Sequence, residues 1–335
     1  MSTKSIVCIA AACVVGVLGL VLWFALGPDG GPKAIGSALT CRVGYQQVAL
    51  YRHVFVAKEK GFFEKHGLDV ELIQFADANQ QLQALLAGQI DAAGLSNMNV
   101  VLTVEHKEPG TLRLGPFLVW KEDAFPDYII SRKEAGIKSL KELEGRTIGL
   151  HPGSAVKAFC LAVLSPVIDT NKCTFIEITP GTMYAALASG RVDALYCMDP
   201  VPTVAVEKGV AEVLLPNPMA RLVPPPTPIS ALTFTSKGTR DGPDKARRII
   251  AGVEDAIEYM RKPGTEKDVA EIVAKYTGAS AELSLKMNRS EYWKTSEIDR
   301  KRVQELADKF AECGAAPARV DTKDLVLTPQ DLGVK

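Results

Sequence analysis

The stretch LLAGQIDA at residues 85–92 returns as LASGRVDA at residues 187–194, always 102 positions later. In each copy apolar residues end a helix, a glycine provides the left-handed stop, and a strand then opens with an apolar residue and an Asp. This repetition predicts two α/β units of similar build within one chain. We expect Asp91 and Asp193 to bond backbone groups at a turn rather than to contact a ligand.

Short apolar strands alternate with amphipathic helices on both sides of these copies. The predicted strands are residues 40–44, 68–75, 90–95, 145–150, 174–178 and 192–197, and the predicted helices are residues 53–66, 80–87, 154–164, 183–189, 243–261, 266–276 and 297–312. Such alternation predicts an α/β fold with mainly parallel sheets. Two α/β domains that face each other enclose a cleft, which is the usual place for a small ligand.

The N-terminus holds a separate feature, an uncharged run of 21 residues from Ile6 to Leu26 that follows Lys4. Such a run spans about 30 Å as a helix, the thickness of a bilayer core, which favours an uncleaved anchor. A long signal peptide is the alternative, with a cleavage site near residues 36–38. Both interpretations place the chain from about residue 40 onward outside the cytoplasm. Residues 27–40 are predicted to form a linker.

Composition excludes several classes of protein. The 335 residues carry 39 basic and 39 acidic side chains, and a net charge of zero argues against nucleic-acid binding. The seven cysteines and four histidines form no CxxC pair or metal-ligand cluster, so we expect no metal or cofactor. Cys160 and Cys173 are the best candidates for a disulfide in an exported chain, although buried free thiols are the default.

Polar loops follow several of the predicted strands. The loop at residues 45–53 after the first strand offers Gln46, Gln47 and Tyr51, and Ser96 and Asn97 follow the strand at residues 90–95. Ligands of open α/β sheets bind at the carboxyl ends of strands. These side chains are therefore candidate hydrogen-bonding partners for a small polar ligand. Each loop alone also fits an ordinary surface turn.

A second set of candidates follows the later strands. Gly153 permits a close backbone approach, and Ser154 opens a helix whose free N–H groups suit an oxyanion. An ordinary helix cap at Ser154 is the alternative. Thr182 and Asp199 lie in equivalent places, at a helix start and after the strand at residues 192–197. No GxSxG, HExxH or GxGxxG motif occurs, so the sequence indicates a binding protein and no enzyme.

Four segments in order resemble the nitrate/sulfonate/taurine type of ABC-transporter substrate-binding proteins. They are residues 42–46 with 56–70, residues 85–95, residues 139–149 with Gly153-Ser154, and Asp193-Ala194 with Met198-Asp199-Pro200. The resemblance covers about residues 41–260. Cys197-Met198 and Val201 depart from the aromatic residues that the family often has there. This departure counts against a nitrate or an ordinary sulfonate as ligand.

The resemblance implies a two-lobed type 2 periplasmic-binding-protein (Venus-flytrap) fold after the N-terminal hydrophobic helix. Its expected parts are residues 1–26 as anchor or signal, 27–40 as linker, 41–130 as the first part of lobe 1, 131–232 as lobe 2, and 233–335 as return crossing and C-terminal helices on lobe 1. The nine candidate residues would then face each other across the cleft.

The resemblance also implies the function, namely capture of a small polar or anionic organic ligand for ABC-type import. The ligand would be sulfonate-, nitrate-, taurine- or pyrimidine-like, and the partners would be a permease, an ATPase and, through residues 6–26, the inner membrane. Two alternatives stay open. One is an enzyme of pyrimidine or cofactor biosynthesis on the same fold, and the other is a membrane-anchored ligand sensor or adaptor.

Overall fold

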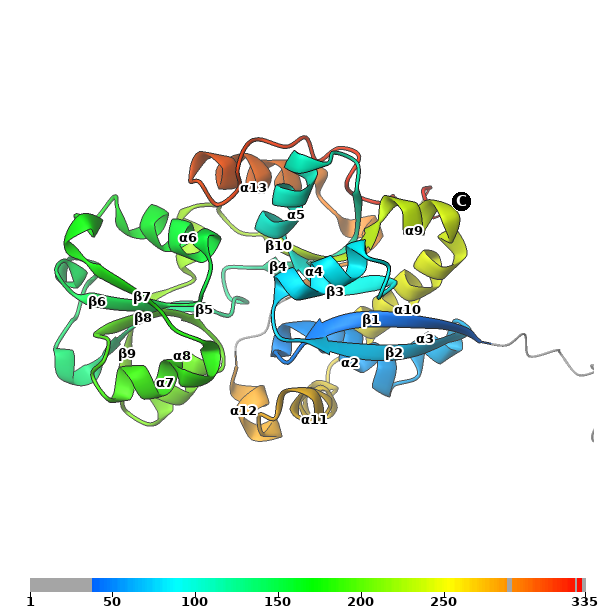
Figure 1. The fold of residues 1–335 in the computed structure, drawn as a ribbon. Coiled ribbons are helices and arrows are strands. Elements are labelled where there is room, and N and C mark those ends of the chain that lie inside the picture. The colour runs from blue at the N-terminus through cyan, green and yellow to red at the C-terminus, as the bar shows by residue number, and fades with distance from the viewer. Residues whose placement is uncertain (1–37, 288–290, 329, 333–335) are drawn as a thin grey trace, which may run out of the picture. The chain divides into compact units, whose positions relative to one another are not determined.

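The computed structural model describes residues 38–287, 291–328 and 330–332, which form two mixed β-sheets covered by helices (Figure 1). The first sheet has the order β11-β4-β10-β3-β1-β2, and the second has the order β7-β6-β8-β5-β9. The first sheet contains β1 (Leu39–Gln46), β2 (Leu68–Phe75), β3 (Ala92–Asn97), β4 (Leu112–Trp120), β10 (Thr227–Thr235) and β11 (Glu291–Trp293). The second contains β5 (Asp127–Arg132), β6 (Thr147–Leu150), β7 (Thr174–Glu177), β8 (Ala194–Met198) and β9 (Ala211–Pro216).

The expected α/β fold is therefore present, but the expectation of mainly parallel sheets is wrong. Strand β1 is parallel to β2 and β3, and β6 is parallel to β7 and β8. Strand β10 lies antiparallel between β3 and β4, and β5 lies antiparallel between β8 and β9. The antiparallel pairs arise because β10 and β5 follow direct links between the sheets instead of helical crossovers.

The repeated sequence has the same structure in both sheets. Its glycines, Gly88 and Gly190, have φ angles of 70° and 74°, which are the left-handed helix stops expected. The carboxylate of Asp91 accepts from the backbone N–H of Arg42 at 2.7 Å, and that of Asp193 accepts from the N–H of Thr147 at 3.0 Å. Each Asp N–H also donates to the carbonyl oxygen of the same partner at 2.8 Å. Both Asp residues thus bond backbone groups, as predicted, but those groups belong to the neighbouring strand and not to a turn.

Two links join the sheets. The chain leaves the first sheet after Trp120 and enters the second at Asp127, and it returns between Pro216 and Thr227. The first sheet is consequently built from both ends of the described chain, with β10 inserted between β3 and β4. The predicted division into lobes at residues 41–130, 131–232 and 233–335 stays a prediction.

Helices flank both sheets. They are α2 (Arg52–Glu59), α3 (Phe62–Lys65), α4 (Ala78–Leu86), α5 (Met98–Lys107), α6 (Ser154–Leu164), α7 (Pro180–Ala188), α8 (Val201–Glu207), α9 (Ser236–Asp241), α10 (Pro243–Arg261), α11 (Glu266–Thr277), α12 (Ala281–Lys286) and α13 (Arg300–Glu312). The single helix expected over residues 53–66 is wrong, because Gly61 adopts a left-handed φ of 70° and separates α2 from α3. The helix expected from residue 297 begins at Arg300, since Asp299 caps the N–H groups of Lys301 and Arg302.

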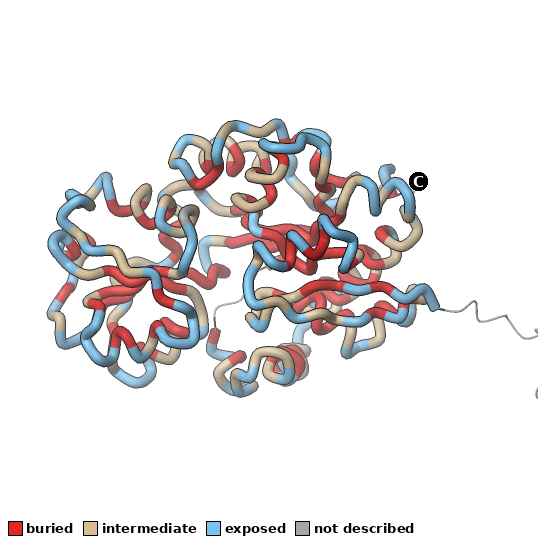
Figure 2. The backbone as a smooth tube through the Cα atoms, viewed as in Figure 1, coloured by how far each residue is buried: buried red, intermediate tan, exposed pale blue. Residues whose placement is uncertain are grey.

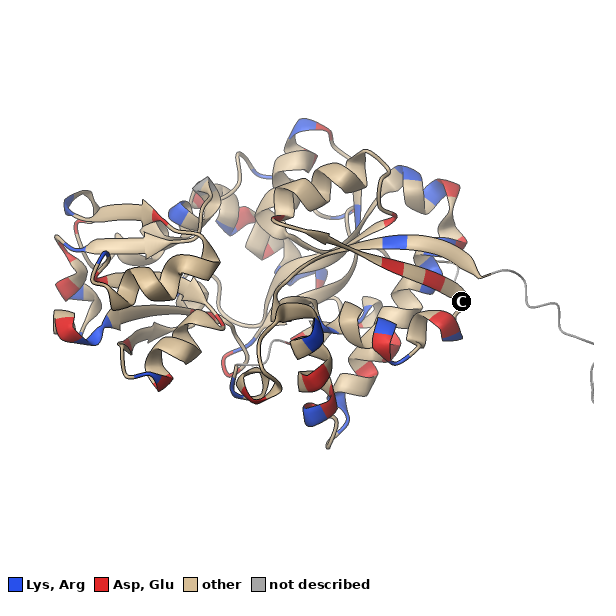
Figure 3. Ribbon diagram, turned by 60° about the horizontal axis from the view of Figure 1, so that its bottom comes forward, with Lys and Arg blue, Asp and Glu red and all other residues tan. Residues whose placement is uncertain are grey.

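The cores follow the two sheets. In the first, α10 turns one apolar face inward, with Ile249, Ile250, Val253 and Ile257 at helical spacing and all buried. The second sheet has two separate apolar clusters, one around Leu143 and Ile148 and the other around Met183 and Leu195. Figure 2 shows buried backbone along the strands of both sheets. Charged residues of both signs lie mainly on the helices and turns (Figure 3), in keeping with the zero net charge.

The expected hydrophobic helix at residues 6–26 and the linker up to residue 37 lie outside the described residues. Within the described chain, no helix has the length and apolar character needed to cross a membrane. Cys160 and Cys173, the candidate disulfide pair, are free thiols, and Cys173 Sγ donates to the carbonyl oxygen of Leu143 at 3.3 Å.

Candidate ligand-binding site

The loop after β1 is held by a buried tyrosine. The Tyr51 hydroxyl, in a side chain that is 3 % exposed, donates to Gln81 Oε1 at 2.7 Å and contacts the carbonyl oxygen of Leu95 at 3.0 Å. Gln46 Nε2 donates to the Tyr51 hydroxyl at 3.0 Å and to Gln81 Oε1 at 3.2 Å. The structure therefore brings Gln46 and Tyr51 together and commits the Tyr51 hydroxyl to a network inside the protein.

The other candidates of the first sheet lie at the same edge. Gln47 is exposed and receives a hydrogen bond from Gln74 at 3.4 Å. Ser96 is buried within β3, and the exposed Asn97 ends that strand and accepts from the Ser230 hydroxyl of β10 at 2.8 Å. Because β1 and β3 are parallel neighbours, Gln46, Gln47 and Asn97 share the carboxyl edge of the sheet. Gln47 and Asn97 expose polar groups there.

The start of α6 follows β6 in the second sheet. The helix begins at Ser154, and Gly153 is its N-cap residue, with a φ of 129° that favours glycine. The alternative that Ser154 is the N-cap is thus wrong, because the N-cap is the preceding residue, Gly153. The Gly153 N–H donates to Glu177 Oε1 at 3.3 Å. A ligand oxyanion at this helix start would have to compete with that exposed carboxylate.

Thr182 and Asp199 follow β7 and β8, the two neighbours of β6. Thr182 is an exposed residue of the first turn of α7, and its hydroxyl bonds the Thr179 carbonyl oxygen at 3.1 Å. Asp199 is half-buried and accepts from the Thr203 hydroxyl at 2.5 Å. Since β6, β7 and β8 are parallel, Gly153, Ser154, Thr182 and Asp199 lie at one edge of the second sheet.

Each sheet thus presents its own candidates at its carboxyl edge. That the two sets face each other across a shared ligand stays a prediction. A cavity of about 860 Å³ borders Arg52, the residue after Tyr51, but none of the nine candidates lines it.

Two polar residues at these edges were missed by the sequence reasoning. Gln81 of α4 is 1 % exposed and bonds the Gly44 carbonyl oxygen at 2.8 Å as well as Tyr51. Asp127 opens β5 directly after the link from the first sheet and is also 1 % exposed. No local signal distinguished Gln81 from the polar residues beside it, and the partners of both residues come from segments distant in sequence.

Asp127 has an unusual environment for a carboxyl group. Its Oδ2 accepts from the Met219 N–H at 3.3 Å and lies 3.5 Å from the Tyr196 hydroxyl, while Oδ1 has no hydrogen-bond partner among the described residues. Burial raises the pKa of Asp127 to about 7. The Asp127 carbonyl oxygen also accepts from the N–H of Asn217, whose side chain bonds the Lys121 carbonyl oxygen at 3.1 Å. Asp127 therefore ties the outgoing link to the returning one.

Solved structures of known proteins have the same fold. The periplasmic aliphatic sulphonate binding protein SsuA of Escherichia coli matches with a TM-score of 0.70 at 19% identity, covering 87% of this chain and 92% of that one. The desulfurization enzyme DSZB matches with a TM-score of 0.62 at 17% identity, covering 88% and 98%. At these identities the likeness shows the fold alone, which is that of periplasmic binding proteins.

Curated relatives cover most of the chain. A Brucella abortus (strain 2308) protein named “Putative binding protein” is 26% identical over 310 residues, covering 88% of this chain and 92% of its own. A “Putative aliphatic sulfonates-binding protein” of Bacillus subtilis (strain 168) is 25% identical over 306 residues, covering 85% of each. The family model described as “NMT1/THI5 like” matches residues 51–266. The chain belongs to the NMT1/THI5-like family.

Proposed function

We propose that this chain is an extracytoplasmic solute-binding protein, which captures a small polar or anionic organic molecule for ABC-type import. The observation that carries the proposal is the pair of sheets with matching strand order, each with polar groups at its carboxyl edge. Relatives whose names describe binding of sulfonates support the same role. The partners would be a permease and an ATPase.

The proposed binding residues divide between the two sheets. Gln46, Gln47, Tyr51, Ser96 and Asn97 would act from the first, and Gly153, Ser154, Thr182 and Asp199 from the second. Tyr51 would act by fixing Gln46, to which it is hydrogen-bonded, because its own hydroxyl is already committed. Closure of the two parts on a ligand would use the links at residues 121–126 and 217–226. Residues 6–26 would keep the protein at the inner membrane.

A thermal-shift screen of the full-length protein tests this function. The ligands are nitrate, taurine, alkanesulfonates and aminopyrimidines. A ligand at a hundredfold excess over its Kd should stabilise the protein by about 2.7 kcal/mol, because it binds only the folded state. The double variant Ser154→Ala/Asp199→Ala should lose most of the ligand-induced shift in melting temperature. The control variant Asp69→Ala, at an exposed residue, should keep that shift. If none of these ligands shifts the melting temperature, the proposed function is wrong.

An enzyme on the same fold is the second candidate, favoured by two matches. One is the desulfurization enzyme DSZB, and the other is a “Putative thiamine biosynthesis protein” of Haemophilus influenzae (strain ATCC 51907 / DSM 11121 / KW20 / Rd), 22% identical over 283 residues. The thiols give little support to nucleophilic chemistry, since burial raises the pKa of Cys41 and of Cys160 to about 12. Conversion of a bound aminopyrimidine or sulfinate, followed by mass spectrometry, would establish this alternative.

A further inference from the structure

A cavity of about 860 Å³ lies beside the first sheet, apart from the nine candidate residues. Its walls come from α10, α11, α12, β11, the link after β4 and the start of α2. Much of the wall is aliphatic, from Ile257, Val269, Val273, Leu285 and Met287. A cavity of this size matches those that hold small organic ligands, and its lining suits an apolar body.

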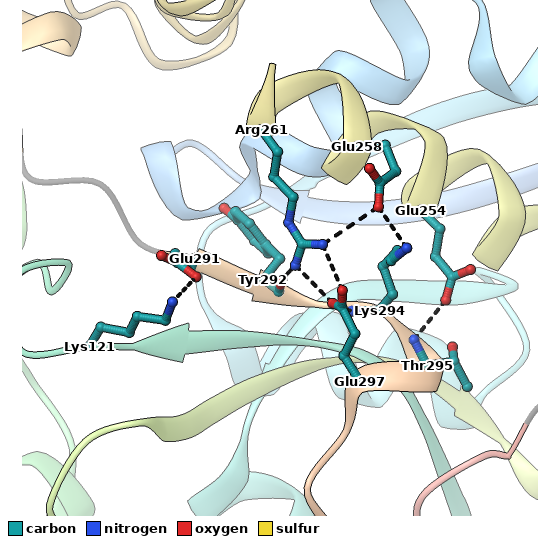
Figure 4. A network of polar contacts seen from close by, with 9 residues as sticks. All are labelled: Lys121, Glu254, Glu258, Arg261, Glu291, Tyr292, Lys294, Thr295 and Glu297. Atoms are coloured by element: carbon teal, nitrogen blue, oxygen red, sulfur yellow. Dashed lines mark hydrogen bonds and ion pairs between the residues drawn. The ribbon is translucent and has the colours of Figure 1, made fainter. Parts of the chain in front are cut away.

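Most of the charged side chains that line the cavity have partners. Figure 4 shows Lys121 paired with Glu291, and Arg261 with Glu297. The Arg261 contacts are bidentate, at 2.7 and 2.8 Å. These pairs leave little net charge on this part of the wall.

Arg52 differs from the other two lining cations. Its side chain is buried, at 8 % exposed, and its Nε donates to the Ala49 carbonyl oxygen at 3.1 Å. Within residues 38–287, 291–328 and 330–332, no carboxylate lies within ion-pair distance of its guanidinium group. An arginine does not lose its proton in a protein, and a buried charge without a counter-charge is costly. This guanidinium group therefore favours an anion in the cavity.

The immediate neighbours of Arg52 supply no such counter-charge. His53 Nε2 donates to the Gly94 carbonyl oxygen at 3.1 Å, and the centre of its ring lies 4.6 Å from that of the Tyr292 ring. The Tyr292 hydroxyl donates to the Leu50 carbonyl oxygen at 2.8 Å and stays neutral, because burial raises its pKa. The remaining lining carboxylates are the exposed Asp123 and Glu266, which has a partner of its own.

A second polar group in the wall supports the same conclusion. Ser284 of α12 is 7 % exposed, and its hydroxyl has no hydrogen-bond partner among the described residues. A buried hydroxyl without a partner costs about 1–3 kcal/mol, so its persistence in a cavity wall points to a polar group on an occupant. Arg52, the lining cation without an ion-pair partner among the described residues, and the unpartnered Ser284 hydroxyl thus border the same cavity as the aliphatic wall.

We propose that this cavity binds an amphiphilic carboxylate, whose head group pairs with Arg52 and whose alkyl body lies against α10, α11 and α12. The site is separate from the solute site proposed above and needs no residue of the second sheet. Lys121 and Ala124 of the outgoing link line it, so an occupant would also contact the segment that joins the two sheets.

Isothermal titration of the full-length protein with decanoate tests the proposal. Arg52→Met keeps the length of the side chain and removes its charge, and it should weaken decanoate binding at least tenfold. The exposed Arg191→Met is the matched control and should bind as the original protein does. Decan-1-ol and decylamine, which lack the anionic head, should bind at least tenfold more weakly than decanoate. Equal binding of decanoate by Arg52→Met and the original protein would overturn the proposal.

A second variant separates loss of the site from loss of the fold. Ala270 lines the cavity and is 4 % exposed, so Ala270→Phe fills the chamber and leaves Arg52 in place. It should also weaken decanoate binding. The double variant Ser154→Ala/Asp199→Ala, which alters the solute site, should leave decanoate binding unchanged. If that double variant abolishes decanoate binding while Arg52→Met and Ala270→Phe retain it, decanoate occupies the solute site and the proposal of a separate cavity is wrong.

Discussion

The two repeated segments bond their neighbouring strands identically but fill the space beside them differently. Asp91 exchanges backbone and side-chain bonds with Arg42 of β1, and Asp193 does the same with Thr147 of β6. Yet Gly94 in β3 occupies the position that Tyr196 has in β8, since both lie three residues after the Asp. The ring of Tyr51, which comes from another segment, packs over Gly94. In β8 the buried side chain of Tyr196 occupies the corresponding space itself. The repeat thus preserves the backbone connection and leaves the packing free to vary.

The largest effect is expected from removing the space that Gly94 provides. A Cβ atom there would lie 2.7 Å from the Gly44 carbonyl oxygen and 3.0 Å from the Tyr51 ring, and a backbone atom cannot move aside cheaply. We expect Gly94→Ala to lower the free energy of unfolding by about 3 kcal/mol in urea titrations. Gly115→Ala in β4 is the control, because its Cβ would meet ordinary contacts at 3.5 Å. Equal stability of the two variants would contradict this account.

The next largest effect on stability is expected from the backbone clamp, the pair of hydrogen bonds by which Asp91 or Asp193 holds the neighbouring strand. Asp91→Ala and Asp193→Ala each leave a strand N–H without its carboxylate acceptor, and we expect each to lower the free energy of unfolding by about 2 kcal/mol. Asp69→Ala, on an exposed position of β2, should change it by less than about 0.5 kcal/mol. A large difference between the two clamp variants would show that the two copies are not equivalent.

A smaller, pH-dependent effect on stability is expected at Asp127, a residue of the second sheet without a counterpart in the first. Its folded pKa of about 7 lies above the ordinary value of 3.8, so the folded protein holds this proton where the unfolded chain has released it. The contribution to stability therefore falls as pH rises between about 4 and 7. Relative to Asp127→Asn, the original protein should lose about 1 kcal/mol of unfolding free energy between pH 5 and pH 6.

Comparing the original protein with Asp127→Asn separates the effect of Asp127 from that of the histidines. His53 and His151 have pKa values lowered to about 4 by burial and give stability the opposite trend, but they do so in both proteins. Parallel stability curves for the original protein and Asp127→Asn would mean that the carboxyl group is not protonated in the folded state.

The smallest expected effect concerns an ion pair that only the first copy has. Lys245 Nζ lies 2.9 Å from Asp91 Oδ1, and both side chains are partly exposed. Lys245→Ala should lower the free energy of unfolding by about 0.5 kcal/mol, as is typical of such pairs. A double-mutant cycle with Asp91→Ala measures the coupling directly. A coupling above about 2 kcal/mol would make the ion pair, and not the backbone clamp, the main role of Asp91.

Local sequence patterns predicted the elements that have strong local signals. Residues 68–75, 154–164 and 243–261 match β2, α6 and α10, because apolar spacing and glycine or proline boundaries define them. The strand expected at residues 90–95 begins two residues later, since Asp91 bonds the neighbouring strand before pairing becomes regular.

Contacts between distant segments were beyond sequence reasoning. Arg52 stood inside the polar loop at residues 45–53, but its burial depends on α10, α11 and β11, more than 200 residues later. The commitment of Tyr51 to Gln81 and Leu95 likewise depends on α4 and β3. Polar residues could therefore be placed at strand ends, while the direction of each side chain could not.

The insertion of β10 between β3 and β4 has a consequence for the order in which the protein is made. By the time residue 216 has been synthesised, every strand of the second sheet exists, whereas the first sheet still lacks the strand that joins β3 to β4. The sheet that begins first is thus finished last. A growing or translocating chain passes through a stage with two unpaired strand edges, the kind of surface that associates with other chains. Synthesis of residues 227–235 supplies the strand that pairs with both of these edges.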